Sequence, residues 1–506
     1  MRSSVEALII GGGATGTGIA RDLAMRGVEV MLVEAGDFAA GATGANHGML
    51  HSGARYAVAD PLSARECAEE GAVLKRIARF CIEDTGGLFV SAKEDDAGYV
   101  DRFLPACRKA GIDAREIGIG EALEIEPGLD KGVKAAVEVP DASIDPFFLV
   151  LGNVSSARRH GATVLNYSPV RSIRRVGDGF EAVAGSGRRE RRIAADVIIN
   201  AAGSRAGEVA AMLDVSIPMC IDKGTLVVFN GRLVGRLVNR LRPPSDGDIL
   251  VPHRTATILG TTSSSGGTGE APTSEEVERL IAEAAAVMPC IREARAIRAY
   301  AGSRPILGGG STGRAASRTF QVIDHACDGA EGLISVVGGK LTTFRLMAEN
   351  ASDAVMEKLG RAERCRTADE EIEPFDDEPS DHFDLEAMRL RHGARIASTD
   401  LPSASWGCGC EAVSRGEMER CASSVDVTNI GDLMRRTRAG MGYCQAGLCA
   451  ANMASAMDQG VRELRSYYGE RWKGVEPVLF GDQLRQEMFK AHLLKVYGID
   501  HTKVVK

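Results

Sequence analysis

The chain has 506 residues, of which 44% are hydrophobic and 26% charged, and its formal net charge is -8. The composition is ordinary for a soluble protein, and the length predicts two or three domains. Ten Asp or Glu residues and no Lys or Arg lie in 369–386, so the remaining residues together carry about +2, which gives no indication of nucleic-acid binding.

The sequence shows no sign of export or of a membrane span. Residues 1–4 lead directly into an apolar segment at 7–10, without the basic start and cleavage site of a signal peptide. No apolar run approaches the ~18 residues that a spanning helix needs. Twelve cysteines in a chain of this size do not predict a disulfide scaffold. We therefore expect a cytoplasmic protein whose membrane contact, if any, is peripheral.

The first predicted elements form a β-α-β unit. A strand over 7–10 runs into the motif GGGATG at 11–16, a helix follows to Met25, and a second strand over 28–33 ends on Glu34. The glutamate follows the motif by 18 residues, close to the ~20 of dinucleotide-binding fingerprints. In such a unit the helix N-terminus binds a pyrophosphate and the acid accepts hydrogen bonds from a ribose. The predicted cofactor contacts here are Gly11, Gly13, Ala14, Thr15, Gly16 and Glu34.

Two later segments repeat the pattern of a short buried strand ending in a glycine turn, at 196–203 and at 333–340. In doubly wound sheets, ligands bind at the carboxyl ends of the strands. NAD would use the same first motif, but a flavin dinucleotide needs distant segments to line it, and the repeated turns therefore favour FAD. The predicted contacts in these turns are Gly203, Gly338, Gly339, Lys340 and Thr342, with helix capping as the alternative role for the threonine.

These landmarks predict an α/β fold class with several domains. A Rossmann-type FAD-binding domain over 1–360 is expected to be interleaved with an α+β substrate domain, at about 86–150 and 216–305. An acidic, exposed linker is expected over 361–404, followed by a small helical cysteine-cluster domain over 405–460 and a C-terminal tail over 461–506. The acidic run at 369–386 is the basis for the linker.

The cysteine module contains two pairs, Cys408-Gly-Cys410 and Cys444 with Cys449, which are separated by 33 residues. Four thiolates bind either zinc or a [2Fe–2S] cluster. Zinc ribbons usually pair two CxxC knuckles, and a flavin passes electrons singly to iron–sulfur centres, so the pattern favours the cluster. Zinc or unliganded thiols remain the alternatives, and Cys421 is expected to be a bystander. Three nearby arginines, at 435, 436 and 438, are expected to offset cluster charge or contact an acidic partner, unless they form a solvated helix face.

Three motifs together resemble one enzyme family. GATGANHGMLHSGARY at 41–56, AGSRP at 301–305 and GGKLTT at 338–343 are similar in order and spacing to FAD-dependent glycerol-3-phosphate dehydrogenases. With the cysteine module, which resembles bacterioferritin-associated ferredoxins, the whole chain resembles the large (A) subunit of the anaerobic enzymes. The resemblance implies oxidation of sn-glycerol 3-phosphate to dihydroxyacetone phosphate, with electrons passing to a membrane quinone. It also implies partner subunits and a peripheral position on the inner face of the cell membrane.

The resemblance also implies roles for particular residues. A phosphorylated substrate needs cations, and a guanidinium can bind a phosphate through two parallel hydrogen bonds. The implied substrate or flavin contacts are Arg55, Tyr56, Arg304, Arg318 and Lys340, and Thr43 is an implied cofactor contact. Arg304 is also expected to stabilise the developing alkoxide.

The proton acceptor is less clearly indicated. Some relatives have a histidine in the strand that here reads KGTLV at 223–227. Here His51, our candidate base, and His47 lie in the loop that is predicted to face the flavin. A hydrogen-bonded structural role is favoured for each of them, so the sequence leaves the base unassigned. Two other functions fit the same motifs: a related FAD oxidoreductase of another small hydroxy or amino substrate, and a non-catalytic electron-transfer protein.

Overall fold

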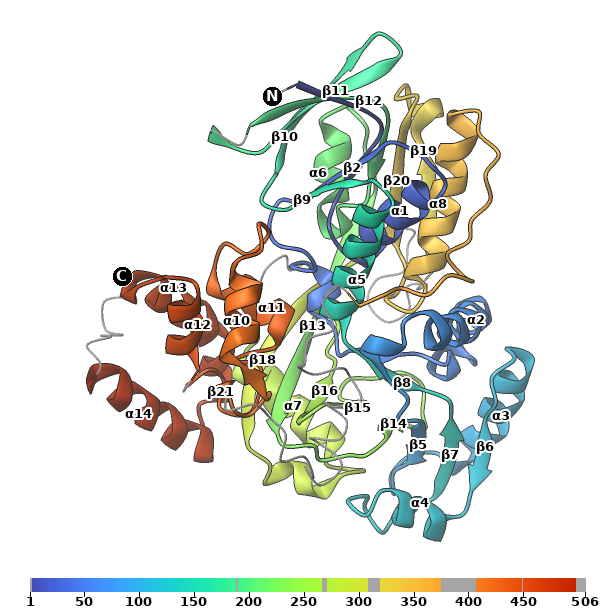
Figure 1. The fold of residues 1–506 in the computed structure, drawn as a ribbon. Helices are drawn as coiled ribbons and strands as arrows, with labels where there is room; N and C mark the ends of the chain where they lie inside the picture. Colours follow the sequence, from blue (N-terminus) through green and yellow to red (C-terminus); the bar gives the residue numbers. More distant parts are fainter. Residues whose placement is uncertain are drawn as a thin grey trace.

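The computed structural model describes residues 2–187, 190–265, 271–307, 319–374, 406–447 and 449–496. Arg318 and most of the predicted linker lie outside these ranges. Figure 1 shows two sheets, one above the other, with a helical module beside them at the C-terminal end. The two sheets are built from alternating stretches of the chain, so neither is a continuous segment.

The first sheet carries the glycine turns. Eight of the described strands form it, in the order β10-β11-β12-β1-β2-β9, with β20 beside β12 and β19 beside β20. The strands β9, β2, β1, β12 and β20 run parallel. Their bounds are β1 Arg2–Ile10, β2 Val30–Val33, β9 Thr163–Leu165, β10 Val170–Val176, β11 Gly179–Ala184, β12 Arg191–Asn200, β19 Phe320–Asp324 and β20 Leu333–Gly338.

The central strands of this sheet are almost wholly apolar because helices cover both faces. On one face α1 (Ala14–Met25), α5 (Pro146–Arg159) and α8 (Phe344–Lys358) pack against the sheet in one apolar core. On the other face α6 (Ala206–Ala211) closes a second core. This arrangement brings the turns after β1, β12 and β20 to the same edge of the sheet, facing the second sheet (Figure 1).

The second sheet draws on both segments predicted for the interleaved domain. Nine described strands form it, in the order β17-β13-β16-β15-β14-β5-β7-β6, with β18 beside β13. Three come from 87–139 and six from 219–307: β5 Gly87–Ser91, β6 Arg115–Ile117, β7 Ala135–Val139, β13 Met219–Asn230, β14 Leu237–Arg240, β15 Ile249–His253, β16 Ala256–Gly260, β17 Ser264–Ser265 and β18 Ala296–Leu307. The helices around it are α3 Val100–Lys109, α4 Ile119–Ile125 and α7 Ser274–Ala284.

A small third sheet and a long helix connect the two larger units. The strands β3 (Met49–Leu50) and β4 (Ile82–Glu83) pair with β8 (Ala142–Ile144). The helix α2 (Pro61–Ile77) begins with Asp60 as its N-cap, whose side chain accepts from the Ser63 amide. The loop from β2 to α2 thus crosses from the first sheet to the second, and it carries the predicted 41–56 motif.

The cysteine module is larger than the 405–460 segment expected from the sequence. It contains β21 Trp406–Cys408, β22 Val413–Ser414, α10 Arg415–Ala422, α11 Ile430–Thr437, α12 Ala450–Ala456, α13 Val461–Val475 and α14 Gly481–Val496. Leu464, Tyr467, Tyr468 and Leu494 lie in the same apolar core as Cys408 and Cys449. The segment over 461–496 therefore packs as part of this module.

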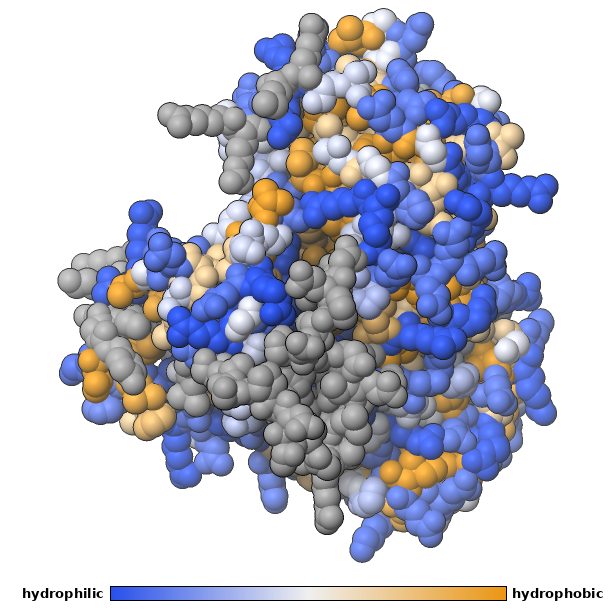
Figure 2. Space-filling model, in the orientation of Figure 1, coloured by the Kyte–Doolittle hydropathy of each residue, from blue (hydrophilic) through white to orange (hydrophobic). Residues whose placement is uncertain are grey.

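Several large apolar side chains of α14 are exposed, while three polar side chains of this helix are buried. Leu484, Met488, Phe489 and Val496 are exposed, and Gln483, Glu487 and Lys490 are buried. Figure 2 shows hydrophobic side chains gathered over this helix at the lower left. In the part of the chain that the structure describes, no helix is both long enough and apolar enough to cross a membrane.

The first part of the predicted linker is anchored to the first domain at a few points. Ile372 is buried in the core of the first domain, and its amide donates to the Ile77 carbonyl at 2.7 Å. The buried Arg21 side chain donates to the carbonyl of Glu370 at 2.8 Å. A buried guanidinium requires acceptors, and the backbone around 370 supplies them. Thr367 and Ile372 are buried, whereas the other side chains over 361–374 are exposed or half-buried, so this stretch contacts the first domain at a few points. The rest of the predicted linker is outside the described residues.

Candidate functional site

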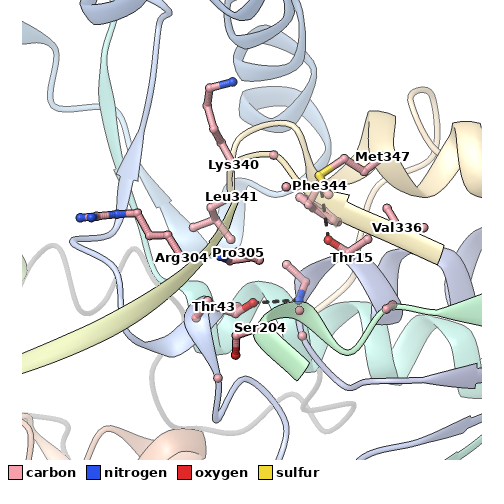
Figure 3. A pocket seen from close by; sticks show the side chains of 18 of the residues that line it. Thr15, Thr43, Ser204, Arg304, Pro305, Val336, Lys340, Leu341, Phe344 and Met347 are labelled. Carbon is pink, nitrogen blue, oxygen red and sulfur yellow. Dashed lines mark hydrogen bonds between the residues drawn. The ribbon is translucent and has the colours of Figure 1, made fainter. Parts of the chain in front are cut away.

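A cavity of about 1140 Å³ lies where the glycine turns of the first sheet face the second sheet. Figure 3 shows side chains from several elements meeting there, among them Arg304, Lys340 and Thr43. The predicted residues that line the cavity are Gly11, Gly13, Ala14, Thr15, Glu34, Thr43, His51, Arg55, Tyr56, Gly203, Arg304, Gly338, Gly339 and Lys340. Gly16 and Thr342 do not line it; both lie behind its wall.

The first glycine turn leaves no room for side chains. Gly11 has φ +120°, and a Cβ there would overlap the carbonyl of Ala201. A Cβ on Gly16 would overlap the Gly11 carbonyl, so this glycine allows α1 to approach β1. A Cβ on Gly13 would lie 3.0 Å from Thr43 Oγ1 and would narrow the cavity. This backbone cradle, at the start of α1, fits the pyrophosphate of a dinucleotide.

Glu34 is held in place at the end of β2. Its two carboxylate oxygens accept from the amides of Gly12 at 2.6 Å and Gly36 at 2.7 Å. The carboxylate lines the cavity, and each oxygen retains a lone pair that can accept from a ribose hydroxyl. Thr43 Oγ1 accepts from the Ala14 amide at 3.1 Å, which brings the 41–56 motif against the start of α1 (Figure 3).

The turn after β20 connects the first sheet to the histidine loop. Gly338 and Gly339 have φ +85° and +79°, which favour glycine. Thr342 is 1% exposed, and its Oγ1 accepts from the His51 amide at 3.1 Å. Its hydroxyl therefore fixes the His51 backbone, a role that sequence reasoning did not foresee.

Three of the basic side chains that line the cavity were predicted, and they come from three separate elements. Arg55 Nη2 donates to Asp248 Oδ2 at 3.0 Å, while its buried Nη1 has no hydrogen-bond partner among the described residues. Lys340 Nζ lies 5.1 Å from the centre of the Tyr56 ring. Arg304, on β18, is the third.

Arg304 is anchored by the strand opposite. Its Nη1 donates to Asp222 Oδ2 at 2.7 Å, and Asp222 is its direct partner in the pairing of β13 with β18. Its Nη2 donates to Thr261 Oγ1. A Cβ on Gly224 would overlap the guanidinium, so the glycine in the predicted KGTLV strand makes room for this arginine. The side chain remains 29% exposed, toward the cavity.

Two histidines lie side by side in the cavity wall. The ring centres of His47 and His51 are 5.7 Å apart, and the His51 ring is 5.4 Å from that of Tyr56. Burial, followed by the positive charges of Arg304 and Arg55, lowers the pKa of His47 to about 3. Burial and the neighbouring His47, Arg55 and Lys340 hold the pKa of His51 well below its usual value. Both rings are therefore neutral at pH 7, and His51 Nδ1 has no hydrogen-bond partner in the described part of the chain.

Residues 6–345 match the family described as FAD dependent oxidoreductase, which covers well over half of the chain. The chain belongs to this family. The A subunit of anaerobic glycerol-3-phosphate dehydrogenase from Escherichia coli (strain K12) is 42% identical, over 96% of this chain and 95% of the relative. The corresponding A subunit from Haemophilus influenzae is 40% identical over 99% and 94%, and the A1 subunit from Haloferax volcanii is 41% identical over 98% and 90%. Within the family, the chain therefore belongs with these A-type subunits.

Solved structures confirm the predicted fold class of this FAD-dependent oxidoreductase. The glycerol-3-phosphate dehydrogenase from Bacillus halodurans, complexed with FAD, matches 97% of this chain and 88% of its own, with a TM-score of 0.58 and 21% identity. Glycine oxidase from Geobacillus kaustophilus matches 73% of this chain and 99% of its own, with a TM-score of 0.60 and 22% identity. At these identities the likeness extends to the fold alone.

The four cysteines of the oxidoreductase's C-terminal module lie together. Cys410 Sγ is 3.7 Å from Cys408 Sγ and 3.8 Å from Cys444 Sγ, and Cys449 interacts with both Cys408 and Cys444. Two sulfurs on one tetrahedral metal at about 2.3 Å would be about 3.8 Å apart. The donor set thus fits a thiolate-bound metal or cluster. In the described ranges, however, no group of three or more His, Cys, Asp or Glu side chains is arranged to hold a single metal ion.

The arginines beside the second cysteine pair bind the oxidoreductase's own first domain. Arg436 donates to both carboxylate oxygens of Asp37, at 2.9 and 2.8 Å, and Arg435 Nε donates to the same side chain at 2.6 Å. Asp37 is buried and lies three residues after Glu34 in the cavity-forming loop. Their expected roles, in offsetting cluster charge, contacting an acidic partner or facing solvent, are replaced by a contact within the chain. No local sequence pattern indicated this pairing.

Proposed function

We propose that this chain oxidises sn-glycerol 3-phosphate to dihydroxyacetone phosphate. One observation supports this most: the cavity that contains the dinucleotide cradle also gathers Arg55, Arg304 and Lys340 beside two neutral histidines. FAD, when bound in this cavity, supplies the hydride acceptor. The names of the curated relatives support the same substrate.

The three basic side chains suit the two negative charges of the reaction, which are the phosphate and the alkoxide. Arg55 and Lys340 lie near Tyr56 and are proposed to bind the phosphate, because the buried Nη1 of Arg55 still has donor capacity. Arg304, held from behind by Asp222, is proposed to stabilise the alkoxide that forms as the 2-hydroxyl loses its proton, until the hydride leaves carbon 2 and the carbonyl forms. Arg318, outside the described residues, stays a predicted substrate contact.

His51 is proposed to accept the hydroxyl proton. In the free protein, burial and the neighbouring cations keep the His51 pKa low, so the ring is neutral and able to accept. A phosphate dianion beside Arg55 and Lys340 would offset part of that positive charge. Substrate binding would then raise the His51 pKa and strengthen the base only when substrate is present.

The four cysteines are proposed to hold a [2Fe–2S] cluster that supplies one-electron transfer. Support comes from the gathering of the four thiols and from the burial of Cys408 and Cys449 in the module core. Lys490, a buried residue of α14, lies 3.5 Å from the position of a Cβ on Gly447, between the second pair of cysteines. The helix thus packs beside the second pair of cysteines. Zinc is the alternative occupant.

We further propose that electrons continue to a membrane quinone through partner subunits, with the chain peripheral on the inner face of the membrane. The relatives are named as A-type subunits, which supports the existence of partners.

The activity is tested by mixing anaerobic protein of verified FAD content with sn-glycerol 3-phosphate and following the visible flavin absorbance. Rapid bleaching is expected, and glycerol without phosphate should bleach little. A flavin that stays oxidised would refute the proposed reaction and favour a non-catalytic electron-transfer protein. Bleaching by phosphate-free hydroxy or amino substrates alone would favour a related oxidoreductase.

The cluster is tested separately by iron and acid-labile sulfide analysis. Cys444→Ser should remove iron and sulfide while FAD is retained, because the flavin cavity is formed by other elements. Cys421→Ser, in the same module, is the matched control and should retain both. Zinc without iron in protein purified anaerobically would contradict the cluster assignment.

A further inference from the structure

Arg438 is a buried charge at the junction of the two proposed sites. It follows α11 with φ +64°, a backbone conformation that favours glycine, and it is 3% exposed. Interactions of the side chain must therefore offset the backbone strain. Its Nη1 donates to Asp145 Oδ2 at 2.6 Å and lies 3.1 Å from His253 Nε2, while its Nε donates to Glu411 Oε2 at 3.1 Å.

On the cysteine side, these contacts reach the first cysteine pair. Glu411 directly follows Cys410 and is 1% exposed, and its Oε1 accepts from Thr255 Oγ1 at 3.1 Å. A Cβ on Gly442 would lie 2.6 Å from Cys410 Sγ and 3.0 Å from Glu411 Oε1. The carboxylate and the thiol are thus packed against the same stretch of backbone.

On the cavity side, the contacts reach the histidine loop. Asp145 follows Ile144, whose amide donates to the Gly48 carbonyl at 2.8 Å. A Cβ on Gly48 would lie 3.4 Å from His253 Nδ1, so His253 packs directly against this loop. Gly48 stands between His47 and Met49, which both line the cavity.

Arg438 therefore connects two parts of the chain. Through Glu411 it reaches the backbone beside Cys410, and through Asp145 and His253 it reaches the loop over 47–49. Because Asp145 and Glu411 accept from different nitrogens of the same guanidinium, displacing either carboxylate leaves a buried charge without its partner. We propose that Arg438 is a positioning residue that fixes the first cysteine pair relative to the cavity loop, so that occupancy of the cysteines and order in the loop are coupled. This inference rests on the proposed function of the two sites.

The coupling is measured without turnover, by amide hydrogen exchange of full-length holoprotein before and after iron and sulfide are removed and then restored. Restoring iron and sulfide should slow exchange over 46–50 by about tenfold in the unsubstituted protein, the size of a moderate coupling between sites. In Arg438→Met this effect should disappear. Arg415→Met is the matched control, since Arg415 is exposed and pairs with Glu419 within the module, and it should keep the full effect.

A second measurement separates this proposal from the proposed reaction. In Arg438→Met, bleaching of the flavin by sn-glycerol 3-phosphate should stay within about twofold of the unsubstituted rate, whereas the appearance of the reduced-cluster EPR signal should slow by about tenfold. Arg438→Lys retains the charge but cannot contact both carboxylates, and it should give intermediate values. Arg438→Lys also replaces Arg438→Met in both experiments if the methionine variant does not fold.

The outcomes are distinct. Failure of the flavin to bleach in the unsubstituted protein overturns the proposed reaction, while the exchange experiment still tests Arg438. Unchanged protection of 46–50 together with an unchanged EPR rate in both Arg438 variants overturns the coupling.

Discussion

The cradle at the start of α1 and the contact between the cysteine module and the first domain are stabilised in different ways. In the cradle, backbone packed against backbone decides the residue type, as at Gly11 and Gly16. In the contact between the module and the first domain, buried charges decide the residue type, as in the pairing of Arg436 with Asp37. In the cradle, Gly16 packs on the carbonyl of Gly11, and Gly11 packs on the backbone of Ala201. The contact instead joins the side chains of two residues that are 399 positions apart. The two regions should therefore respond differently to substitution.

The largest effect is expected from Gly16→Ala. A Cβ at this position overlaps the Gly11 carbonyl, and neither the strand nor the helix can move without disturbing the core. We expect a loss of more than about 4 kcal/mol in the free energy of unfolding, and protein that purifies without flavin. Urea denaturation and flavin content measure both. Gly118→Ala is the control, because a Cβ there meets nothing within 4 Å, and it should behave as the unsubstituted protein. If Gly16→Ala retained its full flavin content, the cradle would tolerate side chains.

Arg304→Leu tests a position inside the cavity where a charge, and not backbone packing, is expected to decide the residue type. The substitution removes a guanidinium that Asp222 and Thr261 hold in place. The rate of flavin bleaching by sn-glycerol 3-phosphate should fall about 10²–10³-fold, with the FAD content unchanged. Arg174→Leu, on the exposed face of β10, is the control. Equal rates for both variants would remove Arg304 from the reaction.

The contrast between local patterns and pairs that are distant in sequence explains which features the sequence could predict. The β-α-β unit was recognised because hydrophobic strands and glycine turns are local patterns: the predicted strand over 28–33 is observed at Val30–Val33, and the helix ends at Met25 as expected. Both segments predicted for the second domain supply strands to one sheet. The glycine-turn residues of the cavity were found for the same reason, since they lie at strand ends. Thr43, Arg55, Tyr56 and Arg304 lie elsewhere and were indicated only by the family resemblance.

Side-chain pairing across the chain was not predictable. The sequence indicated no role for Asp37, and the three arginines were assigned a role beside the cluster, at an acidic partner or on a solvated helix face. Their pairing depends on how the module docks, which no local periodicity encodes. The Arg55–Asp248 pair, 193 residues apart, was missed in the same way. Burial of Ile372 likewise required knowledge of the core that it enters.

The contact itself is tested by Asp37→Asn. The asparagine retains one acceptor but removes the charge that faces Arg435 and Arg436, which should cost about 2 kcal/mol in the free energy of unfolding. Earlier proteolytic release of the module on heating is also expected, with flavin content preserved. Asp482→Asn, at an exposed pair with Arg485, provides the comparison and should change neither quantity. Stability equal to the unsubstituted protein would mean that apolar packing alone docks the module.

The smallest effect is the dependence of the free energy of unfolding on pH. It involves both regions, because His51 lies in the cavity and His253 lies beside Arg438 where the module meets the rest of the chain. Burial lowers the pKa of His253 to about 3, with Arg438 adding to the effect, and the His51 pKa also lies well below its usual value. The unfolded chain therefore binds protons at these histidines before the folded chain does, and stability is lost as pH falls below about 6.5. Each histidine should contribute up to about 1.4 kcal/mol per pH unit. Urea midpoints at decreasing pH below this value measure the slope, which should be smaller in His253→Gln and unchanged when the exposed His160 is replaced by Gln. If His253→Gln leaves the slope unchanged, this histidine is already charged in the folded protein, and its packing between the Gly48 loop and Arg438 would have to accommodate a second positive charge.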